Sequence, residues 1–340
     1  MKQDNLNFKN KLKSIIKHHY KNCSKYKKVL DFLNYDLNNN NDLKDQPYLP
    51  VNLFKEQELM SISKSKVFKV LNSSGTSNYN LSKIYLDKEN SQNQVKALNK
   101  IMSKVLGKER LPMLIIDYHN IGEDRFRFNA KIAAINGFSI FGKNHTYLLK
   151  KDKSINYDLL NGFLSKYGDK PFLIFGFTFN IYENLILKLD KNKILKDFSK
   201  GIILHGGGWK KLENLKIDNK KLKSILSKKI AINNVYNYYG LIEQTGSIFV
   251  ECTKCKCFKT NEYSEILIRD KNLEILPTGK KGYVQLFSLL PTSYPGHIIL
   301  TEDIGEIVKN NKNCDTCKNE TNFLIHGRFP KSVVRGCSDV

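Results

Sequence analysis

Four cysteines occur as two closely spaced pairs, an arrangement that suits a tetrahedral metal ion. The pairs are Cys252 with Cys255 and Cys314 with Cys317, each separated by two residues. Four thiolates are the full ligand set of a structural Zn²⁺ site. The pairs therefore predict a zinc site, with Cys257 as an alternative to Cys255, unless they are surface thiols or a redox pair.

A short loop of small polar residues follows a strand-like apolar run and has the composition of a phosphate-binding loop. Consecutive backbone N–H groups and hydroxyls in such a loop can surround a phosphate group. An ordinary turn is the alternative, since the Gly-Lys-Ser/Thr ending of a Walker loop is missing. The residues concerned, after the run at 67–71, are Ser73, Ser74, Gly75 and Thr76.

Three consecutive glycines follow a second apolar run and would let a flat ligand or a phosphate approach the backbone closely. They are Gly206, Gly207 and Gly208, preceded by His205. Glycine has no Cβ, so a ligand can contact the main chain directly at such a turn. A tight turn after a strand, with the single tryptophan as a core residue, is the alternative.

Three further motifs carry side chains suited to a nucleotide, although each alone is typical of a solvated charged turn. Tyr239 beside Gly240 can stack on a purine, and Glu243 four residues after Tyr239 can hold Mg²⁺. Asp303 lies in an acidic turn and can accept hydrogen bonds from ribose hydroxyls. Arg328 follows a glycine and can bind phosphate or ribose.

The composition indicates a globular protein with a basic surface. Hydrophobic residues make up 41% of the 340, which is enough for a core and excludes a disordered or coiled-coil chain. The formal net charge is +23, yet only six of the 56 basic residues are Arg. Because Arg supplies the planar fork that suits phosphate and base contacts, this composition favours a solvated surface that attracts anions such as ATP over a nucleic-acid reader.

The sequence shows no sign of secretion or of a membrane span. Seven cysteines are too few for a disulfide-rich secreted scaffold of this length, and no signal peptide opens the sequence. No apolar run approaches the roughly 18–20 residues that span a bilayer. We expect a soluble, cytoplasmic protein.

The elements that must position these residues alternate between strand and helix. Apolar residues recur with helical spacing in residues 1–45 and 219–228, and short apolar runs such as 113–116 and 172–175 suit buried strands. Past residue 245, short strands and turns dominate. This pattern predicts an α/β fold with a largely parallel sheet, joined to a β-rich subdomain.

Three segments are expected along the chain. Residues 1–45 form a helical segment, which ends at the linker-like asparagine tract 38–41. Residues 46–235 form an α/β subdomain that contains the phosphate loop. Residues 236–340 form the β-rich subdomain, with the cysteine-rich loops and a tail that contains Cys337.

The order of the motifs is more specific than any one of them. A Ser/Gly/Thr loop, a glycine turn, Tyr-Gly-x-x-Glu, an acidic turn and Gly-Arg, in this order, resemble the adenylate-forming superfamily of acyl-CoA synthetases, nonribosomal adenylation domains and luciferases. The family's loop ends Thr-Thr-Gly, whereas this one reads Thr76-Ser77-Asn78. The resemblance implies the large α/β domain of these enzymes without their C-terminal lid, so Lys331 or another lysine would replace the lid's catalytic lysine.

A closer resemblance is to the LuxE-type acyl-protein synthetases of the fatty-acid reductase complex of bacterial bioluminescence. It extends over about residues 46–340. The segments that carry it are 49–55, 82–87, 111–117, 175–178, 205–211, 237–247, 291–297 and 335–339.

The resemblance implies a role in ATP binding for each of the motifs. The loop from Ser73 to Thr76 would cradle the triphosphate, and Glu243 would hold Mg²⁺. Asp303 would bind the ribose, with Arg328 near phosphate or ribose. The residues that would flank the adenine are Gly206, Gly207, Gly208, Tyr239 and Gly240.

Cys337 is the residue that the resemblance implies as acyl acceptor. It lies between Gly336 and Ser338 with Arg335 nearby, and a neighbouring positive charge increases the thiolate fraction of a cysteine. A carboxylic acid, expected to be a fatty acid, would be activated as acyl-AMP and then transferred to Cys337. The acyl group would pass on to a partner acyl reductase or another acceptor protein.

Two other functions remain open at this point. A CoA ligase-like adenylating enzyme of surface-polysaccharide synthesis would use the same ATP site with a diffusible or carrier-bound acceptor. A zinc-containing nucleic-acid-binding protein would account for the net charge and the cysteine pairs, and would show steeply salt-dependent binding.

Overall fold

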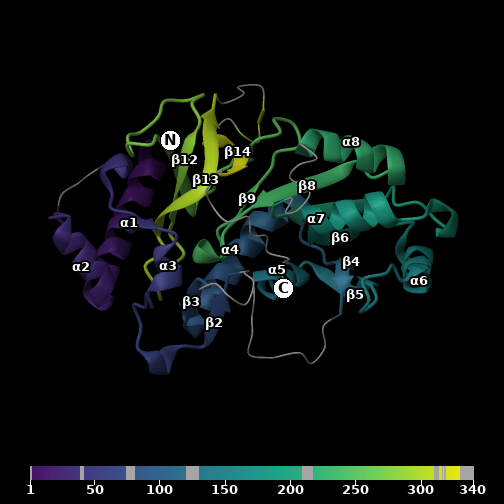
Figure 1. Ribbon diagram of the computed structural model, residues 1–340, viewed down its shortest axis with the longest axis horizontal. Coiled ribbons are helices and arrows are strands. Elements are labelled where there is room, and N and C mark those ends of the chain that lie inside the picture. Colours follow the sequence, from purple (N-terminus) through teal and green to yellow (C-terminus); the bar gives the residue numbers. More distant parts are fainter. Residues whose placement is uncertain are drawn as a thin grey trace. The chain divides into compact units, whose positions relative to one another are not determined.

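The computed structural model divides the chain into two compact units (Figure 1). Among the described residues, the first comprises those up to Ile101 and those from Gly240 to Phe329, and the second comprises those from Met102 to Tyr239. The N-terminal helices and the β-rich part of the chain therefore belong to the same unit. The structure describes residues 2–38, 42–73, 81–119, 130–208, 217–309, 314, 315, 317 and 319–329.

Five parallel strands lie side by side in the second unit, in the order β5-β4-β6-β7-β8. All six residues of β6 are buried, as is typical of a central strand that is covered on both faces. The largely parallel sheet predicted from the apolar runs is confirmed. The strands are β4 (Leu111–Tyr118), β5 (Gly142–Leu149), β6 (Phe172–Phe177), β7 (Gly201–Gly206) and β8 (Asn234–Tyr239).

Helices connect these strands, and two of them begin at polar capping residues. The Asn156 side chain accepts a hydrogen bond from the Leu159 N–H at the start of α6, and Asp218 does the same for Lys221 at the start of α8. Both helices bury an apolar stripe in the core of the unit. The helical segments are α5 (Ala130–Ser139), α6 (Tyr157–Tyr167), α7 (Thr178–Ile181), η3 (Tyr182–Lys188), η4 (Lys191–Lys193) and α8 (Asn219–Ile230).

Aromatic side chains fill the core beside β6 and β8. The Phe138 ring lies 4.9 Å from that of Phe175 and 4.6 Å from that of Tyr238, measured between centroids. All three rings are buried. Aromatic residues in this part of the sequence therefore stabilise the core through close packing.

The first unit is built on an antiparallel sheet with the order β10-β14-β13-β12-β11. Leu49 and Pro50 of β1 pair in parallel with β13. The β-rich region predicted past residue 245 is confirmed. The strands of this sheet are β1 (Leu49–Pro50), β10 (Phe258–Lys259), β11 (Ser264–Arg269), β12 (Gly282–Ser288), β13 (Ile298–Val308) and β14 (Asn322–Arg328), and the short strand β9 (Phe249–Val250) is not part of it.

The same unit contains the N-terminal helices and a small hairpin. The hairpin pairs β2 (Lys69–Asn72) with β3 (Lys83–Leu86) in antiparallel fashion. The predicted N-terminal helices are present as α1 and α2. The helical segments are α1 (Lys2–Asn22), α2 (Ser24–Phe32), η1 (Leu43–Asp45), α3 (Leu53–Glu56), η2 (Lys64–Lys66), α4 (Lys88–Leu106), which continues into the second unit, and η6 (Ile242–Gln244).

Buried histidines join the N-terminal helices to the residue that precedes β13. His19 stacks on His297 with ring centroids 4.6 Å apart, and its Nδ1 lies 2.7 Å from Ser61 Oγ. The Tyr26 hydroxyl lies 3.0 Å from His297 Nε2. Burial lowers the pKa of His19 to about 3 and that of His297 well below its usual value, so both rings are neutral at pH 7.

Gly206→Ala tests how closely β7 and β8 pack. A Cβ at Gly206 would lie 2.6 Å from the Tyr238 ring and 2.7 Å from the Tyr238 carbonyl oxygen. Because a backbone oxygen cannot rotate away as a side chain can, we expect the free energy of unfolding to fall by about 1–3 kcal/mol. Gly208→Ala is the matched control, since no described atom lies within 4 Å of its added Cβ. Equal stabilities of the two variants in chemical denaturation would contradict this packing.

Candidate active site

Glu243, the predicted magnesium ligand, lies in a short 3₁₀ turn that its neighbours hold in place. The Gln244 side-chain amide donates a hydrogen bond to the Gly296 carbonyl oxygen at 2.9 Å. Gly246 ends the turn with φ at +84°, and a Cβ there would come within 2.8 Å of Gln94. Glycine is therefore required for both the left-handed backbone and the close approach of α4.

The Glu243 carboxyl group is buried, and its surroundings determine how readily it ionises. Burial raises its pKa above the usual value. The nearby Ser82 hydroxyl, the backbone N–H of Glu243 and the positive charges of Lys55 and Arg328 oppose this effect, although Ser82 Oγ makes no hydrogen bond to a described group. A carboxylate that has lost its water and faces only distant cations is suited to accept a metal ion.

Ser82 also closes the base of the predicted phosphate loop. The Ser73 N–H donates to the Ser82 carbonyl oxygen at 3.0 Å, and the Ser82 N–H donates to Ser73 Oγ at 2.9 Å. The Ser82 hydroxyl is near enough to Glu243 to favour its ionised form, so the loop base lies close to the carboxylate without a hydrogen bond between them. Three predicted loop residues lie outside the described part of the chain: Ser74, Gly75 and Thr76.

Asp303 and Arg328 face each other across neighbouring strands. They form a cross-strand pair of β13 and β14, with Arg328 Nε 3.6 Å from Asp303 Oδ1. The Asp303 N–H donates to Thr301 Oγ1 at 3.1 Å, and its side chain is only 11% exposed. A fixed carboxylate beside a guanidinium is chemically suited to ribose hydroxyls and phosphate.

A second polar group beside these residues was missed by sequence reasoning. The Asn52 side-chain amide donates to Glu302 Oε1 at 2.7 Å, and Lys55 Nζ lies 4.0 Å from Glu302 Oε2. Lys55 also contacts Asn52 Oδ1. Its charge acts on Glu243 together with that of Arg328. The available signal was the position of Asn52 and Lys55 in the segment 49–55, which carried the family resemblance.

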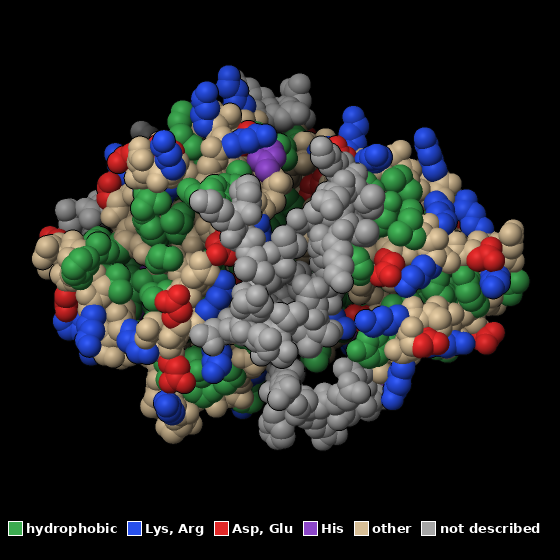
Figure 2. Space-filling view, in the orientation of Figure 1, with side chains coloured by type: hydrophobic (Ala, Val, Ile, Leu, Met, Phe, Trp, Pro, Cys, Tyr) green, Lys and Arg blue, Asp and Glu red, His purple; other side chains and the backbone are tan. Residues whose placement is uncertain are grey.

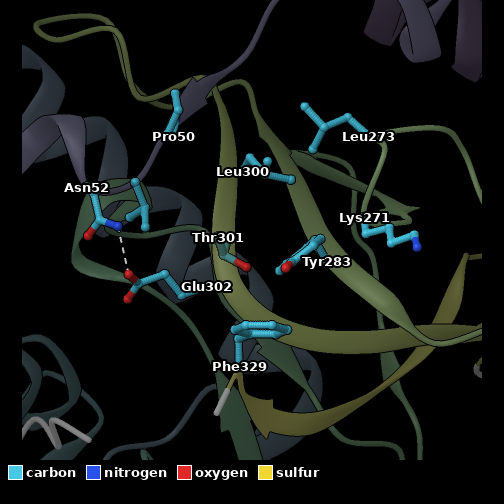
Figure 3. Close-up of a pocket in the computed structure, with 10 residues that line it drawn as sticks. Pro50, Asn52, Lys271, Leu273, Tyr283, Leu300, Thr301, Glu302 and Phe329 are labelled. Atoms are coloured by element: carbon cyan, nitrogen blue, oxygen red, sulfur yellow. Dashed lines mark hydrogen bonds between the residues drawn. The ribbon is translucent and has the colours of Figure 1, made fainter. Parts of the chain in front are cut away.

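Glu302 and Asn52 also border an open pocket of about 410 Å³ (Figure 3). Figure 3 shows their hydrogen bond at one side of this pocket, with Tyr283 and Phe329 nearby. The rings of Tyr283 and Phe329 lie 5.5 Å apart. The lining is completed by Pro50, Val51, Lys271, Leu273, Leu300 and Thr301.

The predicted glycine turn lies at the end of β7 in the second unit, and a neutral histidine supports it. The Thr178 hydroxyl donates to the Gly206 carbonyl oxygen at 3.1 Å, so His205 Nδ1, 2.9 Å from Thr178 Oγ1, carries the proton between them. Burial, followed by the charge of Lys223, lowers the pKa of His205 to about 3. Gly207 has φ at +79°, so a side chain there would be strained.

The described candidate residues divide between the two units. The first unit contains Ser73, Gly240, Glu243, Asp303 and Arg328, whereas the second contains Gly206, Gly207, Gly208 and Tyr239. In the first unit, Ser73 is hydrogen-bonded to the Ser82 backbone close to Glu243, and Arg328 pairs with Asp303 while its charge acts on Glu243. Cys337 lies outside the described residues.

The structure brings the four cysteines of the two Cys-x-x-Cys pairs together. The Sγ atoms of Cys252, Cys255, Cys314 and Cys317 all lie within 4.8 Å of one another. The Cys252 and Cys314 sulfurs are 3.7 Å apart, close to the roughly 3.8 Å expected between ligands of a tetrahedral Zn²⁺ with bonds of about 2.3 Å. Cys257 is not in this group, and its Sγ donates to the Cys255 carbonyl oxygen. The donor set therefore fits a zinc ion.

The described helices include no membrane span, and the face shown in Figure 2 has no basic stripe. None of the described helices is both long and apolar enough to cross a bilayer. In Figure 2, Lys and Arg side chains are scattered among acidic and apolar ones over the visible face. This scatter on the visible face is typical of a solvated basic surface.

Solved structures with a similar fold are adenylate-forming ligases and related enzymes. An open conformation of 2-hydroxyisobutyryl-CoA ligase, in complex with 2-HIB-AMP and CoA, matches 96% of this chain and 70% of its own, with a TM-score of 0.73 and 12% identity. The luciferase-like enzyme of the mealworm Zophobas morio matches 80% of this chain and 60% of its own, with a TM-score of 0.51 and 14% identity. The fold is thus that of the large domain of adenylate-forming enzymes.

The sequence identifies the family within this class. The chain belongs to the family described as acyl-protein synthetase, LuxE, which matches residues 1–340. It is also 23% identical over 298 residues to the long-chain-fatty-acid–luciferin-component ligase of Vibrio harveyi, which covers 86% of this chain and 77% of that protein. The chain is accordingly an ATP-dependent, acyl-adenylate-forming ligase.

Glu243→Gln tests the electrostatics of the site through stability. Because the pKa of Glu243 is raised in the folded state, its ionisation destabilises the fold as pH rises from the usual value through the raised one. We expect the glutamine variant to be more stable than the native protein at pH 8, by about 1.4 kcal/mol for each unit of the pKa shift. This advantage should disappear at pH 4, where both side chains are neutral. Denaturant titrations at the two pH values measure it, and an advantage independent of pH would contradict the assignment.

Proposed function

We propose that this protein activates a fatty acid as acyl-AMP and transfers the acyl group to its own Cys337 for delivery to a partner acyl reductase. The observation that carries the proposal is the buried Glu243 carboxylate, which lies near Ser82 at the base of the Ser/Gly/Thr loop. The family match and the fatty-acid ligase of Vibrio harveyi support the substrate class.

Glu243 would hold the Mg²⁺ that accompanies ATP. Proteins bind Mg²⁺ through one or two carboxylates together with phosphate oxygens and water, which matches a single buried carboxylate beside a phosphate loop. The ion would replace the hydration that burial removes from Glu243 and would neutralise charge on the phosphates. Lys55 and Arg328 place further positive charge near this position.

The remaining residues would hold the nucleoside. Asp303 would accept hydrogen bonds from the ribose hydroxyls, and Arg328 would bind phosphate or ribose. Gly206, Gly207 and Gly208 would let the adenine approach the main chain, with Tyr239 and Gly240 beside it.

Activation would proceed by in-line attack of a carboxylate oxygen of the fatty acid on the α-phosphorus of ATP. A new C(O)O–P bond forms, the bond to the β-phosphate oxygen breaks and pyrophosphate leaves. The protein's contribution is to position the two anions and to offset their repulsion with Lys55, Arg328 and the loop amides.

Acyl transfer would follow on the same protein. The Cys337 thiolate attacks the carbonyl carbon of the mixed anhydride, a thioester forms and AMP leaves with the bonding electron pair. A thiolate is needed because the neutral thiol is a weak nucleophile. The role of Cys337 rests on the resemblance of the segment 335–339 to the family.

The cluster of Cys252, Cys255, Cys314 and Cys317 would bind a structural Zn²⁺. A site with four thiolates leaves no position open for substrate, so the ion would contribute to folding and not to the chemistry.

A CoA ligase is the second candidate, because the first solved relative above is a CoA ligase crystallised with CoA. The two candidates differ in the final acceptor. A CoA ligase would release acyl-CoA and would leave no acyl group on the protein. Nucleic-acid binding is not proposed, since the family match identifies a ligase.

The decisive experiment combines ATP–pyrophosphate exchange over a panel of carboxylic acids with mass spectrometry of the intact protein. We expect exchange to be highest with long-chain fatty acids and the protein to gain the mass of one acyl group. Cys337→Ala should keep the exchange and lose the added mass, because only the second step needs the thiol. Cys257→Ala is the matched control and should retain both.

Each half of the proposal can fail separately. An acyl group that remains on Cys337→Ala would remove this residue from its role. Acyl-CoA as the product, without an acyl-enzyme, would favour the CoA ligase. Absence of exchange with every acid would contradict the activation step itself.

A further inference from the structure

The hairpin formed by β13 and β14 carries two of the candidate nucleotide residues, but its connecting segment is too long to set its register. The strands pair from Val308 with Asn322 at one end to Asp303 with Arg328 at the other. Short turns fix the register of a hairpin through their geometry, whereas a connection as long as 309–321 does not. The connection therefore leaves the register to the burial pattern of the strands and to their other contacts.

The cysteine cluster lies at the connected end of this hairpin. Cys314 and Cys317 belong to the connecting segment, and the Cys317 carbonyl oxygen accepts a hydrogen bond from the side chain of Asn322, the first residue of β14. Cys252 and Cys255 lie between β9 and β10, and β10 pairs with the start of β14. The four sulfurs thus tie the beginning of β14 to two separate loops.

The opposite end of the hairpin carries the Asp303–Arg328 pair. A slip of one residue would place Arg328 opposite a neighbour of Asp303 and would turn its side chain to the other face of the sheet. The charge of Arg328 would then no longer be near Glu243, where it opposes the effect of burial. The pairing of the two strands has an irregular step between Ile304 and Gly305, of the kind that a β-bulge produces.

We propose that metal bound by Cys252, Cys255, Cys314 and Cys317 sets the register of β13 and β14 and thereby positions Asp303 and Arg328 for ATP. This inference deepens the proposed function and rests on it for the identity of the nucleotide. The metal bonds cross-link residues 62 positions apart, which removes far more chain freedom than the strand hydrogen bonds alone. Metal occupancy then controls the affinity for the nucleotide, although the metal and the nucleotide are not in contact.

Cys317→Ser in the full-length protein tests this coupling, with Cys257→Ser as the matched control just outside the cluster. Three quantities are measured: zinc per chain by elemental analysis, hydrogen exchange of the peptide that covers β14, and the affinity for Mg·ATP by calorimetry. We expect the native protein and Cys257→Ser to bind one zinc per chain. Cys317→Ser should lose the metal, exchange its β14 amides at least about tenfold faster and bind Mg·ATP at least about tenfold more weakly.

Two further measurements separate this effect from general misfolding. Exchange of β6, in the other unit, should be unchanged in Cys317→Ser. Removal of zinc from the native protein with a chelator should reproduce faster β14 exchange, and addition of zinc should reverse it.

Several outcomes would overturn the proposal. The first is that the native protein contains no zinc. The second is that loss of the metal leaves both the β14 exchange and the affinity for Mg·ATP unchanged. The third is that a chelator speeds hydrogen exchange equally in β14 and β6. If the native protein binds no Mg·ATP, the proposed ligase function fails, but zinc content and β14 exchange still decide whether the metal sets the register.

Discussion

Burial of the Glu243 carboxyl group is the constraint on which the arrangement of the first unit depends. An ionised carboxylate loses its hydration in such a position, and unless other groups compensate it takes up a proton. Here the nearby Ser82 hydroxyl, the backbone N–H of Glu243 and the charges of Lys55 and Arg328 supply only part of that compensation. A site of this kind binds a divalent cation with little competition from water, but it is less stable without one.

The partners of Glu243 come from separate parts of the first unit, and each has its own anchor. Ser82 is held by the reciprocal hydrogen bonds that close the phosphate loop, and Lys55 is held beside Asn52 and Glu302. Arg328 is fixed by its cross-strand pairing with Asp303. The cysteine cluster lies at the connected end of β13 and β14, opposite to Asp303 and Arg328. In the proposed coupling it therefore acts on the same carboxylate through the register of the two strands.

The sequence was informative where local patterns reflect local structure. Apolar runs located β4 and β6, and helical spacing located α1 and α8, because period and burial follow directly from residue type. Cysteine spacing was enough to predict a four-sulfur cluster. By contrast, the pairing of Asn52 with Glu302 and of His19 with His297 joins polar residues about 250 positions or more apart. Periodic patterns in the sequence do not indicate contacts of this kind. The effect of Ser82 and Lys55 on the pKa of Glu243 could therefore not be predicted.

The ionisation of Glu243 can be followed directly by carbon-13 NMR of the glutamate side-chain carboxyl groups, with the signal assigned by its absence in Glu243→Gln. The account predicts a pKa above the usual glutamate value in the free protein and a fall in that pKa when Mg·ATP is added, because a bound cation favours the ionised form. A signal that titrates like an exposed glutamate, or one that Mg·ATP leaves unchanged, would contradict it.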